Sequence, residues 1–338
     1  MVRLKDVAAR AGVSIMTVSK VLRDAPDIST ATKTRVRLLA KQMGYVPDSM
    51  AQGLRTRTTK IFGVVISSST NPIFSRTLLA LEERTFDLGY DLMLGHTLGL
   101  IEREETLIRR FLARRVDGLF ISPVYRFSPT APVYEELHRR GVPTVLLGPR
   151  APFCQQFVNV ETDDGTASYA AAKHLLQLGH KRIALFSGPA VAPWAQERAE
   201  GYRRALREAQ LEVEDKLIFQ SGTGIEDGEK TALQMLNEGA YATAIHAAND
   251  MVAIGAARVL LRQGLKVPQD ISIVGFGNTL VSELFEVPLT TVRQPKFRLG
   301  TAAVDLMHRL LRGERPPAKR LGAELVIRSS TAPPPSRK

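Results

Sequence analysis

The chain has 338 residues, of which 44% are hydrophobic and 24% charged, and its formal net charge is +12. This length exceeds what one small hydrophobic core supports, so two or three domains are expected. The single cysteine, Cys154, excludes an intrachain disulfide framework and fits a reducing compartment, where we expect it to be a small buried or loop residue.

The positive charge is concentrated near the start of the chain. Residues 1–60 contain 12 lysines and arginines against 4 aspartates and glutamates, whereas the remaining 278 residues carry a net charge of +4. Such an excess of cations suits the neutralisation of nucleic-acid phosphates, although a solvated basic surface explains any charge run taken alone. No apolar run has transmembrane length and no signal-peptide pattern precedes the first helix, so a soluble cytoplasmic protein is expected.

Two short helical patterns flank a sharp turn at Gly12. Apolar residues recur at helical spacing before and after it, namely Leu4, Val7, Ala8, Ala11, Val18, Val21 and Leu22. Glycine accepts the positive φ of a helix end without steric cost, and Ser14 stands where the N-cap of the second helix belongs. The pattern predicts a helix-turn-helix, whose second helix enters the DNA major groove with its N-terminal residues.

A third helix completes this N-terminal head, which we assign to residues 1–46. Ser29 is placed to cap that helix, and Gly44 ends it. Its buried stripe is predicted to comprise Val36, Leu39, Ala40 and Met43. Residues 47–60 follow as a hinge helix and linker; the helix is short and contains Gly53, so it is marginal in isolation. We expect it to fold on DNA, with a plain flexible linker as the alternative.

From residue 61 onward strands alternate with helices. The continuous apolar run at 61–66 is typical of a strand covered on both faces. The pattern then predicts helices at 74–88, 102–114 and 134–140, and strands at 90–94, 117–121 and 142–147. Strands that alternate with helices indicate right-handed β-α-β units and a parallel sheet, hence an α/β fold.

A second series of the same kind begins near residue 165. It has predicted helices at 165–178, 197–209, 227–236 and 250–262, and predicted strands at 182–186, 217–220, 242–246 and 271–274. The chain then passes through 289–292 to a helix at 299–311. Two such α/β lobes resemble the periplasmic-binding-protein fold, in which a ligand cleft lies between two parallel sheets, and we assign them to residues 61–330.

Four short motifs resemble the N-terminal signature of the lactose-repressor (LacI/GalR) family of bacterial transcription regulators. They are Asp6-Val7-Ala8, Ala11-Gly12-Val13-Ser14, Thr17-Val18-Ser19 and Gly44-Tyr45-Val46-Pro47. Later landmarks follow in the family's order, so the resemblance extends to about residue 330. It implies a transcription regulator, expected to be a repressor, in which the helix at 298–312 returns to the first lobe.

The last residues, 331–338, are proline-rich and basic, and we expect them to be disordered. They lack the heptads that form a C-terminal coiled coil and make tetramers of some family members. A homodimer is therefore expected.

The resemblance also assigns DNA-reading positions. It implies that Ile15, Met16 and Lys20 read the edges of the bases. Ile15 and Met16 would pack on thymine methyl groups, and Lys20 would donate to guanine or to a phosphate. The alternative for Ile15 and Met16 is a place in the hydrophobic core. Hydroxyl residues that match phosphate-contacting positions, but are as readily helix caps, are Ser14, Thr17, Ser19, Ser29 and Thr32. Arg23 and Lys33 are candidate phosphate clamps.

Two hinge residues are also assigned to DNA. Leu54 matches the family's minor-groove wedge, whose insertion at a base step unstacks and bends the duplex, and Arg55 beside it would contact the backbone or groove. Two heads and two wedges require a two-fold dimer and a pseudopalindromic operator in double-stranded DNA.

The cleft between the lobes is expected to bind a small-molecule effector, a sugar or sugar acid. Asn71, Ile73 and Phe74 follow the first strand in a loop suited to a polar ligand. Arg198 resembles the family's ligand-clamping arginine, with a surface ion pair as the alternative. Asn249 and Asp250 begin a helix after a strand, where Asp250 resembles the family's ligand-binding aspartate or serves as an N-cap.

Five further residues bear on that cleft. Trp194 is the only tryptophan and either stacks on a sugar face or packs in a core or interface. Phe276 and Asn278 follow a strand where relatives often have an acidic residue, so Asn278 makes the site less anionic. Asp163 and Asp164 match a family pair at the crossover between the lobes, where a role at the cleft edge is open.

No motif for catalysis appears in the chain. It lacks a Walker-type loop, a Gly-x-Ser-x-Gly elbow and any cluster with metal-ligand spacing, so neither an enzyme nor a cofactor or metal is expected. A transport-type sugar-binding protein shares the lobes but needs an export signal and no DNA head. A regulator that responds to a partner protein instead of a metabolite stays open as an alternative.

Overall fold

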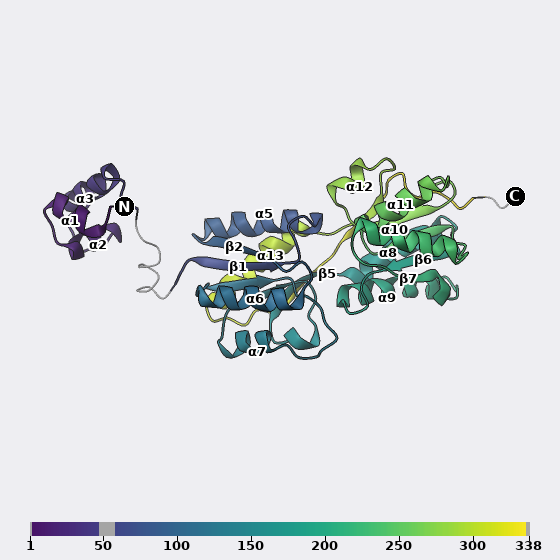
Figure 1. Ribbon diagram of the computed structural model, residues 1–338, viewed down its shortest axis with the longest axis horizontal. Helices are drawn as coiled ribbons and strands as arrows, with labels where there is room; N and C mark the ends of the chain where they lie inside the picture. The colour runs from purple at the N-terminus through teal and green to yellow at the C-terminus, as the bar shows by residue number, and fades with distance from the viewer. Residues whose placement is uncertain (1, 47–57, 336–338) are drawn as a thin grey trace. The chain divides into compact units, whose positions relative to one another are not determined.

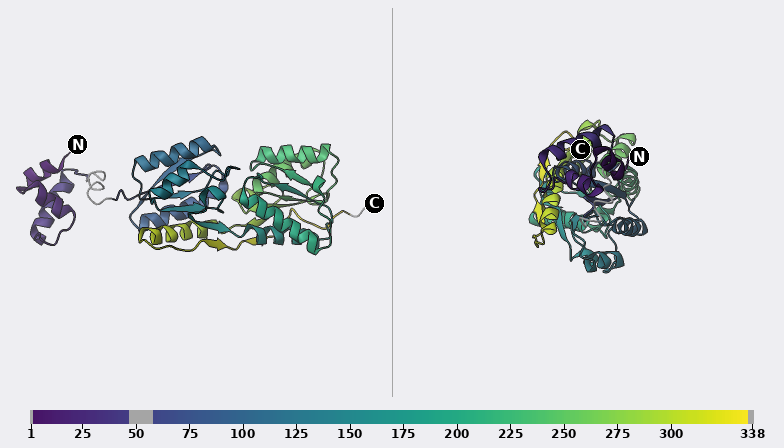
Figure 2. Two further views of the ribbon diagram at one scale, coloured as in Figure 1. Left: turned by 90° about the horizontal axis from the view of Figure 1, so that it is seen from below. Right: turned by 90° about the vertical axis from the view of Figure 1, so that its left-hand side faces the viewer.

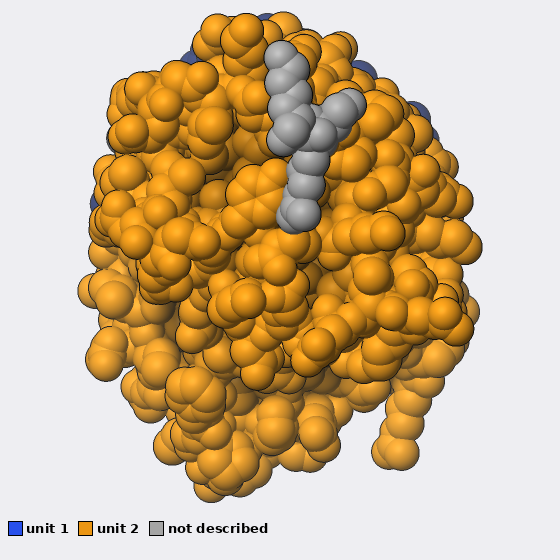
Figure 3. Space-filling model, turned by 90° about the vertical axis from the view of Figure 1, so that its right-hand side faces the viewer, with its two compact units in different colours: residues 1–59 blue, residues 60–338 orange. Residues whose placement is uncertain are grey.

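The computed structural model describes residues 2–46 and 58–335, and the chain divides into two compact units, residues 1–59 and 60–338, coloured separately in Figure 3. Each unit has its own hydrophobic core. Among the described residues, no helix combines the length and the apolar character needed to cross a membrane.

The first unit, called the head below, contains the predicted helices α1 (Leu4–Ala11), α2 (Ile15–Leu22) and α3 (Thr30–Gln42). Small apolar side chains from all of them form one core, comprising Val7, Ala8, Ala11, Val18, Val21, Val36 and Ala40. Gly12 has a φ of +63°, a left-handed conformation that other residues rarely adopt, and it allows the tight turn between α1 and α2. The local spacing of apolar residues therefore predicts the head correctly.

The first lobe of the second unit is built on a parallel six-stranded sheet with the order β11-β5-β4-β3-β1-β2. Its strands are β1 (Ile61–Ile66), β2 (Asp91–His96), β3 (Gly118–Ile121), β4 (Thr144–Leu147), β5 (Val158–Thr162) and β11 (Lys319–Leu321). Its helices are α5 (Pro72–Asp87), α6 (Ile101–Ala113), α7 (Pro132–Arg139), the 3₁₀ turn Pro152–Cys154 and α13 (Lys296–Leu311). Cys154 in that turn is buried.

Alternate side chains of β1 face two helix layers, as expected for a strand covered on both sides. Phe62 and Val64 pack with α5 and α13, whereas Val65 packs with α6 and α7 on the other face. Figure 1 shows α5 and α6 on opposite sides of this sheet. The sequence analysis did not predict the short, partly polar strands β5 and β11, because neither contains a continuous apolar run.

The second lobe repeats this architecture with the strand order β12-β10-β9-β8-β6-β7, in which β12 alone pairs antiparallel. Its strands are β6 (Ile183–Ser187), β7 (Ile218–Gln220), β8 (Ala244–Ala247), β9 (Ser272–Gly277), β10 (Thr290–Arg293) and β12 (Glu324–Val326). Its helices are α8 (Asp164–Gln177), α9 (Pro193–Glu208), the 3₁₀ turn Asp215–Leu217, α10 (Ile225–Asn237), α11 (Asp250–Arg262) and α12 (Leu280–Leu284). Helices α8 and α9 cover one face of the sheet, and α10 and α11 the other.

The chain crosses between the lobes at residue 163, at residues 294–295 and at residues 322–323. The second crossing places α13 against the first lobe, as the family resemblance implies and as the left view of Figure 2 shows. Thr77 Oγ1 donates to Lys296 O at 3.0 Å. A Cβ on Gly300 would lie 2.6 Å from Thr77 O, so glycine permits this close approach of α13 to α5.

The predicted disorder of residues 331–338 is wrong for the part that the structure describes. Thr331 Oγ1 lies 3.0 Å from Thr290 Oγ1, and Ala332 O accepts hydrogen bonds from Ser272 Oγ and from the buried His180. The segment is ordered because polar groups at the edge of the second lobe form hydrogen bonds with it. Its proline-rich composition does not report these partners.

Candidate DNA-reading face and effector cleft

The N-terminal turn of α2 presents two apolar side chains to solvent. Ile15 is 51% exposed and Met16 is 68% exposed, whereas Val18 and Val21 of the same helix are fully buried. This pattern excludes the core as the place of Ile15 and Met16. Ser14 caps α2 by accepting a hydrogen bond from Thr17 N at 3.0 Å.

Three candidate DNA-binding cations of the head, Lys20, Lys33 and Arg23, form ion pairs or hydrogen bonds with acceptors of the head itself. Lys20 Nζ pairs with Asp27 Oδ2, and Lys33 Nζ lies 3.1 Å from Asp24 Oδ1. Hydrogen bonding to these lysines lowers the pKa of each of the two aspartates, so both carboxylates are ionised at neutral pH. Arg23 Nε donates to Ser19 O at 3.0 Å.

The remaining DNA-binding candidates divide between the structured head and the hinge. Ser29 caps α3, accepting from Thr32 N at 3.3 Å, and the two hydroxyls lie 2.9 Å apart. The helix-cap interpretation thus holds for Ser14 and Ser29, and it leaves their contacts with DNA as a prediction. Leu54 and Arg55 lie outside the described residues.

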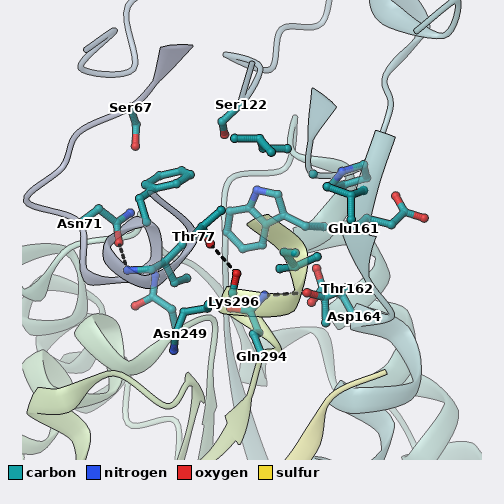
Figure 4. Close-up of a pocket in the computed structure, with 18 of the residues that line it drawn as sticks. Ser67, Asn71, Thr77, Ser122, Glu161, Thr162, Asp164, Asn249, Gln294 and Lys296 are labelled. Carbon is teal, nitrogen blue, oxygen red and sulfur yellow. Dashed lines mark hydrogen bonds between the residues drawn. The ribbon is translucent and has the colours of Figure 1, made fainter. Parts of the chain in front are cut away.

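A cavity of about 280 Å³ lies between the lobes, with both contributing to its wall. Six of the predicted effector residues line it, namely Asn71, Ile73, Phe74, Trp194, Arg198 and Asn249. Figure 4 shows Ser67 and Ser122 on one side and Asn249, Gln294 and Lys296 on the other. The structure therefore brings together loop residues that lie more than 170 positions apart in the sequence.

Asn71 and Asn249 are positioned as helix caps. Asn71 Oδ1 accepts from Ile73 N at 3.2 Å at the start of α5, and Asn249 Oδ1 accepts from Val252 N at 2.9 Å at the start of α11. Asn249 Nδ2 also donates to Thr223 O at 3.0 Å. Capping fixes both amides at the carboxyl ends of strands, where the two lobes face the cavity.

Arg198 is a buried cation of the cleft, and it is only 7% exposed, which excludes a surface ion pair. Its Nη2 donates to Asp164 Oδ1 at 3.1 Å and its Nη1 to Ala248 O at 2.6 Å. The guanidinium stacks on two rings, 3.6 Å from the centroid of Phe276 and 4.7 Å from that of Trp194. Arg198 Nε is buried and has no acceptor among the described residues, which is unusual for a buried donor.

Asp164 is the carboxylate that faces Arg198. Burial raises its pKa to about 6, because the desolvation of the charge outweighs the attraction of the guanidinium. The pair therefore contains a carboxyl that titrates just below neutral pH. Asp163 beside it caps α8 by accepting from Thr166 N at 3.2 Å.

Three predicted effector residues do not line the cavity. Asp250 is fully engaged inside the second lobe, where it accepts from Thr279 N, Thr279 Oγ1 and Thr291 Oγ1. Phe276 lies beneath Arg198 and acts on the cavity through that side chain. Asn278 Oδ1 accepts from Arg328 Nη2 at 2.7 Å, outside the cavity wall. The assignments of Asp250 and Asn278 are corrected because neither amide nor carboxylate is directed to the cleft.

Sequence reasoning missed several wall residues from the crossing segments. Gln294 Nε2 donates to Thr162 Oγ1 at 3.3 Å, and its Oε1 is a buried acceptor without a donor among the described residues. Lys296 Nζ donates to the carbonyls of Gly277 and Asn278 in the second lobe. The sequence feature that could have identified Gln294 and Lys296 is their position just after β10, because a parallel sheet presents ligand-binding groups at the carboxyl ends of its strands.

Besides the hydrogen bonds of Lys296, a second group of contacts joins the lobes at the first and third crossings. Arg320 on β11 donates to Glu197 on α9 at 2.7 Å and to Asp163 at 3.0 Å. Hydrogen bonding to Glu197 is the main cause that raises the pKa of Arg320 above its ordinary value. This network joins the first and third crossings between the lobes to α9 of the second lobe.

Comparisons with known proteins agree with this architecture. A family model described as "Bacterial regulatory proteins, lacI family" matches residues 3–48, and one described as "Periplasmic binding protein-like domain" matches residues 172–331. The HTH-type transcriptional regulator DegA of Bacillus subtilis (strain 168) is 33% identical over 330 residues, 97% of each protein. The HTH-type transcriptional repressor CytR of Escherichia coli (strain K12) is 32% identical, covering 97% of this chain and 96% of that protein.

Solved structures of similar chains have the same fold over nearly the whole length. The lac repressor dimer bound to operator and the anti-inducer ONPF matches with a TM-score of 0.86 and 30% identity, over 98% of this chain and 99% of that one. The complex of the transcriptional regulator CelR with cellobiose matches with a TM-score of 0.74 and 29% identity, over 98% and 100%.

The chain belongs to the lacI family of bacterial regulatory proteins. It is a helix-turn-helix transcriptional regulator with a periplasmic-binding-protein-like domain of two lobes, and the relatives named above are regulators, not enzymes.

Proposed function

We propose that this regulator is a repressor whose affinity for operator DNA is controlled by a neutral sugar bound between its two lobes. The observation that carries the proposal is the cavity itself, in which a buried donor, Arg198 Nε, and a buried acceptor, Gln294 Oε1, both lack partners among the described residues. Buried polar groups are almost always hydrogen-bonded, and a hydroxyl-rich ligand supplies both kinds of partner.

The wall of the cavity supports a neutral ligand of monosaccharide size. Two cationic side chains, Arg198 and Lys296, are balanced by two carboxylates, Glu161 and Asp164. Half-buried Trp194 offers a flat apolar face of the kind that a sugar ring covers. The cavity volume of about 280 Å³ lies just below the range of about 300–1,000 Å³ found for ligand sites. CelR has been solved with cellobiose, a sugar, in the same fold.

Regulation would follow from a shift between lobe arrangements. A sugar that contacts both walls of the cavity binds one arrangement more tightly than the other and so changes their populations. Because the hinge segments of two paired chains must meet on DNA, a change in lobe arrangement alters operator affinity, and operator binding reciprocally alters sugar affinity.

The head would read the operator through the exposed turn of α2. Ile15 and Met16 would pack on thymine methyls and Lys20 would donate to guanine, once the groove competes with Asp27 for its ammonium group. Candidate phosphate contacts are those of Ser14, Thr17, Ser19, Arg23, Ser29, Thr32 and Lys33. Leu54 would be the minor-groove wedge, with Arg55 beside it.

A homodimer is supported by exposed apolar side chains on both lobes. Leu79 and Phe86 of α5 are exposed in the first lobe, and Leu280 and Leu284 of α12 in the second. Large apolar side chains exposed on a monomer are candidates for burial in a protein interface. A two-fold pairing of identical chains would present two heads to a pseudopalindromic operator.

The test combines calorimetry with gel shifts on the full-length protein. A panel of neutral sugars and sugar acids is titrated, and any sugar that binds is then added to the complex with the protein's own promoter DNA. Binding of a neutral sugar that changes promoter affinity supports the proposal, and Trp194→Ala should abolish the sugar response while Phe127→Ala, an exposed ring outside the cavity, should not. Exclusive binding of acids, or no metabolite at all, contradicts it, the latter in favour of a protein partner.

The wedge has its own test. Leu54→Ala should weaken binding to the promoter while leaving binding to unrelated duplex DNA nearly unchanged, because intercalation operates only on the bent specific complex. Equal affinities of variant and wild type on both kinds of DNA would refute that role.

A further inference from the structure

A second hollow, of about 620 Å³, adjoins the effector cavity. Gln294 and Lys296 line both, so the crossing segment forms a shared wall. The first turns of α5 and α13 contribute from the first lobe, and the segment 278–283 and Arg293 contribute from the second. Helices α5 and α12, which flank it, lie on the same side of the two-lobe unit in Figure 1. We call this hollow the crossover groove.

The lining of the crossover groove is strongly basic. Arg76 and Arg298 come from the first lobe and Arg293 from the second, whereas Glu283 is the one carboxylate among the described lining residues. Glu283 already faces Arg328, at 3.6 Å. Arg76 and Arg298 form no ion pair within residues 58–335, and Arg293 reaches Glu324 only at 4.0 Å. Three exposed arginines thus line the crossover groove, and only one carboxylate among the described lining residues opposes them.

The pKa of Lys296 is consistent with this charge imbalance. Its pKa is lowered mainly by burial, and repulsion from Arg76 and Arg293 lowers it further, against the attraction of Asp250. The arginines are thus close enough to Lys296 to disfavour its charged form. A bound anion would relieve the repulsion among these cations.

Backbone donors at the start of α13 add to the site. The N–H groups of Phe297 and Arg298 have no acceptor among the described residues, as is usual in the first turn of a helix. Guanidinium groups form paired hydrogen bonds with phosphate oxygens, and helix N-termini also favour phosphate. Both kinds of donor open on the crossover groove.

We propose that the crossover groove binds the phosphate group of a small phosphorylated metabolite, held by Arg76 and Arg298 from one lobe and Arg293 from the other. This is a second ligand site, distinct from the sugar cavity. A phosphate that bridges guanidinium groups of both lobes would favour the lobe arrangement in which they lie close together, so it would act on the same equilibrium as the effector.

Binding of inorganic pyrophosphate to the full-length protein tests the site directly. Pyrophosphate is titrated by calorimetry at fixed ionic strength, with chloride of equal ionic strength as the reference. The double variant Arg76→Gln, Arg298→Gln should lose about 100-fold in affinity, because each lost charged hydrogen-bonding group weakens binding by about tenfold or more. The matched control is Arg110→Gln, Arg139→Gln, two exposed first-lobe arginines that lie outside the groove and form no ion pair among the described residues. It should bind as the wild type does.

Three results would overturn the proposal. One is equal weakening in both double variants, which means diffuse attraction to a basic surface. Another is no pyrophosphate binding by the wild type while duplex DNA still binds. The third is a change of oligomeric state in the Arg76, Arg298 variant with pyrophosphate affinity retained, which makes the groove a contact between copies. Sugar binding in the effector cavity is measured in parallel, so a failure of the groove is distinguishable from a failure of the proposed effector site.

Discussion

Replacing Arg198 by alanine removes the partner of a buried carboxyl, and its cost should depend on pH. In the wild type, the pKa of Asp164 is raised by burial from an ordinary 3.8 to about 6. The folded state therefore holds the proton more tightly than the unfolded state, so stability falls as pH rises from about 3.8 to about 6 and is level above that. Without Arg198, burial acts unopposed and raises the pKa further, and the fall continues to higher pH.

The size of the effect follows from the proton equilibrium. Keeping a carboxyl protonated costs about 1.4 kcal/mol for each pH unit above its pKa in the unfolded chain. The wild-type penalty stops growing at about pH 6, whereas the Arg198→Ala penalty continues to grow above it, so an assay at about pH 7.5 should show an added loss of at most about 2 kcal/mol. At about pH 5 the carboxyl is largely protonated in both folded proteins, and this part of the loss disappears. Lost stacking on Phe276 and Trp194 adds about 2 kcal/mol that does not depend on pH.

Urea unfolding followed by far-ultraviolet circular dichroism at both pH values measures the difference. Arg207→Ala is the matched control, because it removes an exposed arginine of the same helix that pairs with exposed Glu200. The control should shift the free energy of unfolding by no more than about 0.5 kcal/mol at either pH. An Arg198→Ala variant whose loss is the same at both pH values would show that the ion pair with Asp164 does not carry the effect.

Three further outcomes are expected. Ser14→Ala removes the N-cap of α2 and should lower the stability of that helix by about 1 kcal/mol, seen as faster hydrogen exchange of its first amides; unchanged exchange would contradict the cap. Sugar affinity should fall as pH drops through about 6, since protonated Asp164 no longer fixes the guanidinium of Arg198, and an Asp164→Asn variant that keeps this pH profile would disprove the link. Lys296→Met deletes hydrogen bonds that join the lobes and should reduce the effect of sugar on promoter affinity while sugar still binds; an unaltered ratio of promoter affinities with and without sugar argues against a coupling role.

The head and the alternation of strands and helices were predictable because they depend on neighbours in sequence. The turn at Gly12, the cap at Ser14 and the apolar spacing of α1 to α3 act over a few residues, and each element forms where the local pattern predicts it. The run at 61–66 likewise identifies a strand covered on both faces, since a buried parallel strand needs apolar side chains in both directions.

What the sequence by itself determined is therefore the order of the longer helices and of the apolar strands and, through its motifs, the family of regulators to which the chain belongs. Only the tertiary structure decided the partners: that Arg198 meets Asp164, that Asp250 is directed into its own lobe, and that Lys296 joins two lobes. Hydrophobic periodicity reports which face of an element is buried, but it carries no information on which distant polar group will lie opposite. Those pairings arise when sheets and crossings bring residues tens of positions apart to one edge, and both the cleft and the crossover groove are formed there.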